Sequence, residues 1–334
     1  MNQFQMIKGS RVLTAQEAES VDLGPLAQLA GTWQSAPFFE PNQIAQGWNV
    51  MSVPGPASTS GFVFEVIPYT ETLTFQPVVV ALNRGPFIPV VKYVDGQKVT
   101  DVVEMNQNIT GLMYQQSIIS ACPNGAQCIE RGFPAGSQIH AETGLLLNFS
   151  LQAEPQNPNG GFQFARLSTI PHGNSVLALG TSEVTKNPGN QFFPEVSAHP
   201  TGLNGTAPTG QGIAILDYNA QIDSPVFPGF IQSIPNSFLQ KALGNQVITE
   251  MTTLSMTTSN ANAGGGILNI PFIESNAKAT TMDANFWIQT IQGSSQLQLQ
   301  YSQVINLMFP PTGSTVPVIW PHITINTLVK VSGL

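Results

Sequence analysis

The sequence predicts an all-β fold, either a sandwich or a barrel. Short runs rich in Val, Ile, Phe and Thr recur along the chain, and they are separated by turn residues that include 30 Gly and 26 Pro. Regularly spaced turn signals between short strands are typical of these two architectures. No internal repeat and no break in composition divides the sequence, so residues 1–334 are expected to form a single domain.

Eleven segments carry the strand pattern. In chain order they are 61–67, 72–82, 87–94, 142–152, 162–170, 175–184, 210–218, 264–273, 284–292, 297–309 and 318–329. Gly-Ser-Ser joins two of them within ANFWIQTIQGSSQLQLQYSQ, which predicts a hairpin. In its second strand, alternation places Leu299 and Tyr301 on one face and Gln298 and Gln300 on the other. We expect the glutamine face to meet solvent.

Helix signals are few. In DLGPLAQLA, residues 22–30, Asp22 as N-cap and Pro25 near the start predict one short turn. In PNSFLQKALGNQ, residues 235–246, the apolar residues share one face and Gly244 marks the end.

The cap of the second helix is expected to be Asn236 or Ser237.

Residues 1–20 are interpreted as a flexible arm. Residues 186–212 are interpreted as a long loop, a type of segment that usually covers a site or a sheet edge.

Composition excludes several classes of function. Only 9% of the residues are charged, the net charge is −8, and no basic run occurs. Nucleic-acid binding needs clustered positive charge, so no nucleic-acid partner is expected, and an anionic membrane would repel the chain. The first 20 residues hold no apolar signal region, and no apolar run reaches about 18 residues. These features predict a soluble, cytoplasmic protein without a membrane partner.

The two cysteines, Cys122 and Cys128, lie in the short segment CPNGAQC. A disulfide and a pair of free thiols are both compatible with this spacing. Two cysteines without a second pair do not make a zinc site.

A motif near the N-terminus resembles the opening of the nitrobindin-like family, L-x-P-L-x-x-L-x-G-x-W. The matching residues are Leu23, Pro25, Leu26, Leu29, Gly31 and Trp33. Members of this family are haem-binding β-barrels related in shape to fatty-acid-binding proteins and lipocalins. The family often has G-x-G after the Trp, where this chain has Ser35 and Pro37.

A second match lies near the C-terminus. The family carries Y-x-x-x-M, then a His that opens a strand ending in Leu and a basic residue. Here Tyr301 precedes SQVINLM, and His322, Leu328 and Lys330 follow at looser spacing. HAETG, residues 140–144, is similar to the family's E-x-G strand. The chain is longer than the small nitrobindins and looks more like the longer bacterial relatives described as fatty-acid-binding-protein-like peroxidases.

The resemblance implies an antiparallel up-and-down β-barrel with long loop insertions and one or two short helices. Closure of such a barrel pairs the first strand with the last, which would bring Trp33 and His322 close together. The resemblance implies that His322 is the proximal ligand of haem b iron. Trp33 and Trp320 would then wall the cofactor, and the open iron position would take peroxide or a diatomic gas.

The alternation pattern in the strand of His322 argues against an inward-facing haem ligand. Alternation puts Trp320 and His322 on one face and Ile323 and Ile325 on the other. If the isoleucine face were the core, His322 would point to solvent. A ligand-holding barrel with an outer apolar face covered by insertions would reverse this reading.

Two further histidines are candidates for acid–base chemistry. His172 in TIPHGNS follows a strand in a Pro–Gly turn, from which it could act as a distal base on peroxide or steer a diatomic ligand. His140 and Glu142 are alternate strand residues on one face, and they could orient a proton shuttle. The competing interpretations are an exposed turn histidine and a polar surface patch. His199 is assigned no role.

Two other functions fit the same sequence. The barrel could carry an apolar molecule such as a fatty acid without chemistry, as the 19 Phe and the few charges favour. It could also be a β scaffold that associates with partners or with copies of itself. The sequence contains no G-x-S-x-G, P-loop, H-E-x-x-H or EF-hand motif.

Overall fold

The structure is a computed structural model of the chain. It describes residues 11–12, 21–38, 44–55, 58, 61–83, 87–104, 107–151, 161–189, 193–206, 208, 212–259 and 264–332. Of the predicted arm, 1–20, only β1 (Arg11–Val12) lies within the described residues. Within that part of the chain, none of the helices combines the length and apolarity needed to span a bilayer.

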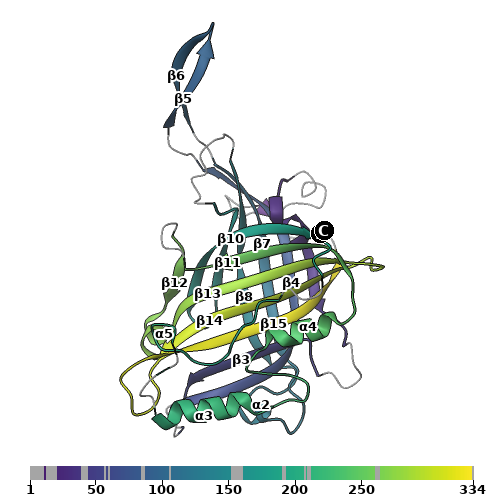
Figure 1. Cartoon of the computed structure of the whole chain (residues 1–334), viewed down its shortest axis with the longest axis vertical. Coiled ribbons are helices and arrows are strands. Elements are labelled where there is room, and N and C mark those ends of the chain that lie inside the picture. Colours follow the sequence, from purple (N-terminus) through teal and green to yellow (C-terminus); the bar gives the residue numbers. More distant parts are fainter. Residues whose placement is uncertain are drawn as a thin grey trace.

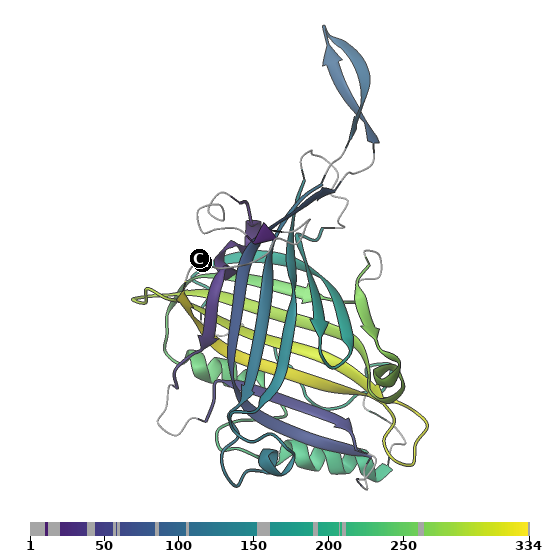
Figure 2. The same ribbon diagram turned by 180° about the vertical axis from the view of Figure 1, so that it is seen from behind.

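Ten strand positions form a closed antiparallel barrel (Figures 1 and 2). Two short strands, β2 and β3, share one position, because both pair with β15 and β4. The pairing of β4 with β7 closes the ring. The strands of the barrel are β2 (Gly31–Ser35), β3 (Gly47–Pro54), β4 (Phe62–Asn83), β7 (Gln107–Ser120), β8 (Gln138–Leu151), β9 (Phe164–Ile170), β10 (Asn174–Lys186), β11 (Ile248–Thr257), β13 (Lys278–Ile291), β14 (Leu297–Phe309) and β15 (Val318–Ser332).

The up-and-down barrel predicted from the sequence is confirmed. Strands next to each other in the ring are also successive in the chain, and the last strand, β15, pairs with the first ones. Trp33 of β2 lies opposite Lys330 of β15, so the N-terminal and C-terminal motifs are on neighbouring strands. Because every barrel strand has a partner on each side, no long edge is left in the ring.

A hairpin, a short strand and a short helix lie beside the ring. The hairpin of β5 (Phe87–Val94) and β6 (Gln97–Glu104) projects away from the barrel (Figure 1). Strand β12 (Gly266–Asn269) pairs with the start of β10, and α5 (Pro271–Asn276) follows it directly. These last two elements lie together at one side of the barrel in Figure 1.

The two predicted helices are present. The first is a 3₁₀ helix, η1 (Gly24–Leu29), and the backbone N–H of Gly24 donates to Asp22 Oδ1 at 2.8 Å. The second is α4 (Asn236–Leu243), which ends at Gly244 with φ of 55°. Its predicted cap was wrong, because Pro235 occupies the cap position and Asn236 Nδ2 donates instead to the Pro194 carbonyl at 2.8 Å.

The strand predicted over 210–218 was wrong. The structure has helix α3 (Gly212–Asp223) there. Ile215, Tyr218 and Ile222 are buried, and their spacing of three and four residues fits one face of a helix. The run IAIL is apolar throughout, as a buried strand would be. A run this short does not distinguish the two-residue period of a strand from the 3.6-residue period of a helix.

Most of the predicted loop over 186–212 has no regular structure where it is described. Its Thr201 forms an isolated β-bridge with Ile319, the second residue of β15. The loop therefore pairs with the edge of β15 at its start, because β3 pairs with this strand only over 323–325.

Helices and loops cover one outer face of the barrel and create a second apolar core. Trp48 of β3 stacks on Phe230 at 4.1 Å between ring centroids and meets Phe238 of α4 edge-on. Ile323 and Ile325 of β15 belong to the same cluster. The isoleucine face of β15 thus packs against the covering segments, and the opposite face turns into the barrel.

The predicted solvent-facing glutamine row of β14 was wrong. Gln298 and Gln300 are 5% and 0% exposed, because α4 covers them. Gln300 Nε2 donates to the Leu239 carbonyl at 2.9 Å and to Thr327 Oγ1 at 3.0 Å. The Gln300 amide therefore joins the barrel wall to the helix that lies on it.

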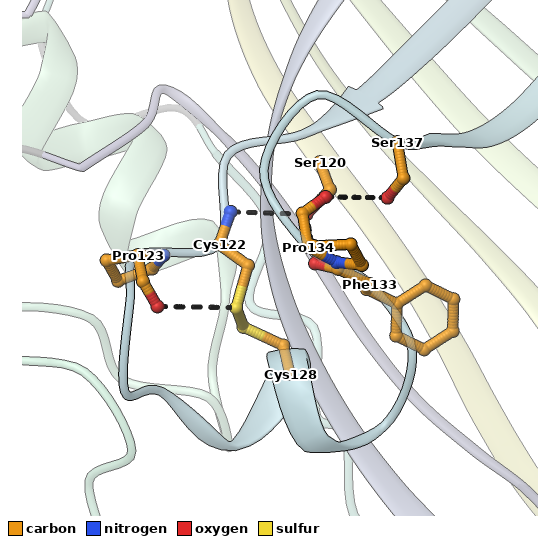
Figure 3. Close-up of a disulfide and its surroundings, with 7 residues drawn as sticks. All are labelled: Ser120, Cys122, Pro123, Cys128, Phe133, Pro134 and Ser137. Carbon is orange, nitrogen blue, oxygen red and sulfur yellow. Dashed lines mark hydrogen bonds between the residues drawn. A yellow bond between two sulfur atoms is a disulfide. The ribbon is translucent and has the colours of Figure 1, made fainter.

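Cys122 and Cys128 form a disulfide across the loop that contains α2 (Gln127–Glu130) (Figure 3). Ser120 fixes the start of this loop. Its Oγ accepts from the Cys122 N–H at 3.1 Å and donates to the Phe133 carbonyl at 2.7 Å. The disulfide thus closes a small loop that follows β7 and precedes β8.

We expect alkylation of the native protein without reductant to label neither cysteine. Replacing both Cys122 and Cys128 with Ser should lower the free energy of unfolding by about 2 kcal/mol, as the chain-entropy model gives for so short a loop. Mass spectrometry after alkylation and urea denaturation measure the two effects. Two labelled thiols in the untreated protein would contradict the assignment.

Candidate functional site

An apolar cavity of about 270 Å³ lies at one end of the barrel interior. It is lined by Asn49, Met51, Val53, Ile67, Phe133, Ile139, His140, Ile170, His172, Asn174, Val176, Ile267, Ile273, Ala277, Ala279, Ile305, Leu307 and His322. Thirteen of these eighteen residues are apolar, and three of the other five are histidines. The chain holds only four histidines, so their gathering at one cavity marks it as the candidate site.

The three histidines come from separate parts of the barrel. His140 is near the start of β8, and His322 is near the start of β15. His172 occupies the three-residue turn between β9 and β10, which Gly173 makes possible with φ of 106°. A larger residue at 173 would also collide with Ile270, which packs against this turn.

His322 faces into the barrel and lines the cavity. Among the described residues its ring has no hydrogen-bond partner. Burial lowers its pKa to about 3, and His140 and His172 add smaller effects in the same direction. The imidazole is therefore neutral at pH 7, and its nitrogens are available to a ligand. The opposing signal from the isoleucine face of β15 is resolved, since the covering helices bury that face.

We expect the ring of His322 to stay neutral between pH 8 and pH 5. Its folded pKa lies below the ordinary value near 6.5, so the ring should take up a proton only near pH 3. Histidine ring resonances in an NMR pH titration can be assigned with His322→Ala. A signal of His322 that titrates near pH 6.5 would show that the ring meets bulk water.

His140 and His172 form a pair at the cavity. His140 Nδ1 and His172 Nε2 are 3.5 Å apart, and the ring centroids are 5.5 Å apart. His140 Nε2 lies 3.5 Å from Glu142 Oε2, as the shared face in β8 predicted. The ring of His172 is exposed, so this side of the cavity is open to solvent.

A buried ion pair lies behind His140. Arg166 of β9 donates from Nη2 to Glu142 Oε1 at 2.7 Å and from Nη1 to Gln303 Oε1 at 2.7 Å. Tyr114 donates to the same oxygen of Glu142 and accepts from Arg166 Nε at 3.0 Å. Burial by itself would raise the pKa of Glu142, but the guanidinium of Arg166, the nearby ring of His140 and the hydrogen bond of Tyr114 lower it to about 2. Glu142 is thus a carboxylate at all ordinary pH values.

The ion pair of Glu142 and Arg166 with its partners forms one buried polar cluster. A second polar cluster surrounds Glu71 of β4. Tyr301, Gln116 and Asn326 all donate to its carboxylate, at 2.7, 2.7 and 2.9 Å. Tyr69 shares a hydrogen bond of 2.9 Å with the Tyr301 hydroxyl. Burial raises the pKa of Glu71, and these hydrogen bonds oppose that rise.

The barrel interior is layered, and β14 shows the order. On its inner face, Leu307 and Ile305 line the cavity. Gln303 belongs to the polar cluster of Glu142 and Arg166, and Tyr301 belongs to that of Glu71. Leu299 lies in the apolar inner core. Alternate residues of one strand share a face, so five successive inner positions cross all three layers. Along β14 the polar layer therefore lies between the cavity and the apolar inner core.

The two predicted cofactor tryptophans do not line the cavity. Trp33 is fully buried in the inner core, where its Nε1 donates to the Leu29 carbonyl at 2.7 Å. Trp320 donates from Nε1 to the Phe309 carbonyl at 3.0 Å and stacks on the Phe309 ring. Both pack in apolar cores in this structure, and their part in walling a cofactor stays a prediction.

His199 lies elsewhere, with its Nε2 3.1 Å from Asp223 Oδ1 in an exposed pair. No three His, Cys, Asp or Glu side chains in the described ranges are placed to hold one metal ion together. Arg166 is the site residue that sequence reasoning missed. The available signal was one Arg within the apolar strand FQFARLSTI, which indicates a buried cation that needs an anionic partner.

No protein-family model matches the chain, and no curated protein matches it in sequence. Among solved structures, the chain is similar to the crystal structure of Rv2717c from M. tuberculosis. The alignment covers 93% of this chain and 100% of that chain, with 15% sequence identity and a TM-score of 0.36. At this score the similarity adds nothing to the argument for the fold, which rests on the strand pairing.

Proposed function

We propose that the barrel binds b-type haem in its apolar cavity through His322, and that the bound group acts on peroxide or a diatomic gas. The observation that carries the proposal is the neutral imidazole of His322, which has no partner among the described residues and faces an apolar space. Two further imidazoles, His140 and His172, line the same space.

The donor and the walls fit a haem. Neutral imidazole is the form that binds iron, and the low pKa of His322 keeps it in that form. Apolar side chains make up most of the lining, as a macrocycle requires. His322 is thus the residue that would hold the iron.

The volume of the cavity sets one condition. About 270 Å³ lies just under the range of about 300–1,000 Å³ that is typical of ligand pockets. The β12–α5 segment contributes Ile267 and Ile273 to the lining, and Gly264 and Gly265 before it have positive φ. An outward shift of this segment at the two glycines would enlarge the cavity, so we include that shift in the proposal.

The bound haem would supply a redox-active iron with one open position. This chain would supply acid–base groups at the same cavity. The carboxylate of Glu142 lies 3.5 Å from His140 Nε2 and favours the ring proton on that nitrogen, which leaves Nδ1 facing His172. His172, at the open side, could then take a proton from a ligand and return it.

Haem titration of the purified protein tests this function. We expect a red-shifted Soret band that saturates at one haem per chain, and co-purified haem when the protein is expressed with adequate iron. A spectrum equal to that of free haem at every ratio would contradict the proposal.

A second candidate function is carriage of an apolar molecule without chemistry. The predominance of apolar residues in the lining favours it. Arg166 points to Glu142 and Gln303, and no Lys or Arg is among the described lining residues, so the cavity suits a neutral ligand better than a fatty-acid carboxylate. Native mass spectrometry showing a bound lipid mass and no haem mass would favour carriage.

Partners and location stay predictions. The net charge of −8 supports the expectation of no nucleic-acid partner, and association between copies of the chain is the alternative left open. The Cys122–Cys128 disulfide speaks against the cytoplasmic location predicted from the sequence, because disulfides persist mainly in oxidising compartments.

A further inference from the structure

The ring nitrogens of His140 and His172 are farther apart than in a typical ring-to-ring hydrogen bond. An N–H···N bond between two rings brings the nitrogens to about 2.9–3.0 Å, whereas His140 Nδ1 and His172 Nε2 are 3.5 Å apart. The ring centroids are 5.5 Å apart.

Two imidazoles that bind one metal ion have this arrangement. With metal–nitrogen distances of about 2.0–2.1 Å and a near-tetrahedral angle, the donor nitrogens are about 3.4 Å apart and the centroids about 5.3 Å apart. The pair in the barrel, at 3.5 Å and 5.5 Å, matches both values within a few tenths of an ångström.

Glu142 fixes the tautomer that metal binding needs. Its Oε2 is buried and has no hydrogen bond within the described part of the chain, and the atom facing it is His140 Nε2 at 3.5 Å. Arg166 keeps Glu142 ionised, so the proton of neutral His140 resides on Nε2. The lone pair on Nδ1 is then directed towards His172. A carboxylate behind a ligating histidine is the usual arrangement that supports a metal ligand.

We infer that His140 Nδ1 and His172 Nε2 bind one divalent transition-metal ion at the mouth of the cavity. The ion has two protein ligands, and its remaining positions face the cavity and solvent, because no third His, Cys, Asp or Glu of the described residues reaches it. Such a site exchanges its ion readily and prefers Cu²⁺ to Zn²⁺. The inference does not depend on haem, because His322 takes no part in the site.

Equilibrium dialysis of the haem-free protein against Cu²⁺ and against Zn²⁺ tests this site. We expect one ion per chain, and a loss of affinity of at least about tenfold in His140→Gln and in His172→Gln. His199→Gln is the matched control, because it removes the exposed His199–Asp223 pair and leaves the cavity intact. The electron paramagnetic resonance spectrum of the Cu²⁺ protein should show two nitrogen ligands, and circular dichroism should show that each variant is folded.

His322→Ala separates this inference from the haem proposal, since it should keep the full affinity for Cu²⁺. The inference is overturned if the wild-type protein binds no ion. It is also overturned if folded His140→Gln and His172→Gln bind as tightly as the wild type. A loss of binding in His199→Gln alone would place the ion at the His199–Asp223 pair.

Discussion

Replacing Arg166 with Met is expected to lower the free energy of unfolding by about 3–5 kcal/mol. The substitution leaves the Glu142 carboxylate buried without its cation, and it removes hydrogen bonds to Tyr114 and Gln303 as well. The side chains of Arg166 and Glu142 are only 5% and 1% exposed, so water cannot replace the lost partner. Urea denaturation at pH 7 measures the loss.

The exposed pair Lys92–Asp101 in the projecting hairpin provides the matched control. Both side chains are about half exposed, so Lys92→Met should leave the free energy of unfolding unchanged within error. If Arg166→Met were as stable as Lys92→Met, the buried polar layer would not hold the barrel interior in the way described.

The cost of Arg166→Met should also depend on pH. The folded pKa of Glu142 is lowered to about 2, below the unfolded value near 4.5. The stability that the ion pair contributes is therefore present above pH 4.5 and is lost as the pH falls towards 2. The difference between wild type and Arg166→Met should shrink over that window. A difference that stays constant down to pH 2 would contradict the assignment.

Replacing His322 with Ala is expected to weaken haem binding at least about 100-fold, which corresponds to about 2.7 kcal/mol. No other residue supplies an unpartnered imidazole on that wall of the cavity among the described lining residues. Added imidazole should enter the vacated space and restore the Soret shift. His199→Ala, far from the cavity lining, is the control. Unchanged haem affinity in His322→Ala would remove this residue as the ligand.

The sequence predicted the fold better than the site. Turn spacing and the two terminal motifs were enough for a closed barrel with Trp33 and the strand of His322 as neighbours. The direction of His322 could not be read from alternation alone, because both faces of β15 are buried, one by the cavity and inner layer and one by helices. The covering helices are formed by segments far away in the chain.

The same reason explains the other corrections. Alternation predicted a solvent-facing row at Gln298 and Gln300, yet α4 covers both, and Leu239 of α4 accepts a hydrogen bond from Gln300. Trp33 and Trp320 lie near the motifs in sequence but pack in apolar cores. The gathering of His140, His172 and His322 depends on ring closure, which brings β8, the β9–β10 turn and β15 around one end of the barrel.

The central claim is that the His322 imidazole points into the cavity and binds haem iron there. Resonance Raman spectroscopy of the ferrous haem-loaded protein tests it most directly. We expect an iron–histidine stretching band that shifts when the histidines carry ¹⁵N and disappears in His322→Ala. A band that persists unchanged in folded His322→Ala, or haem bound without any iron–histidine band, would contradict it.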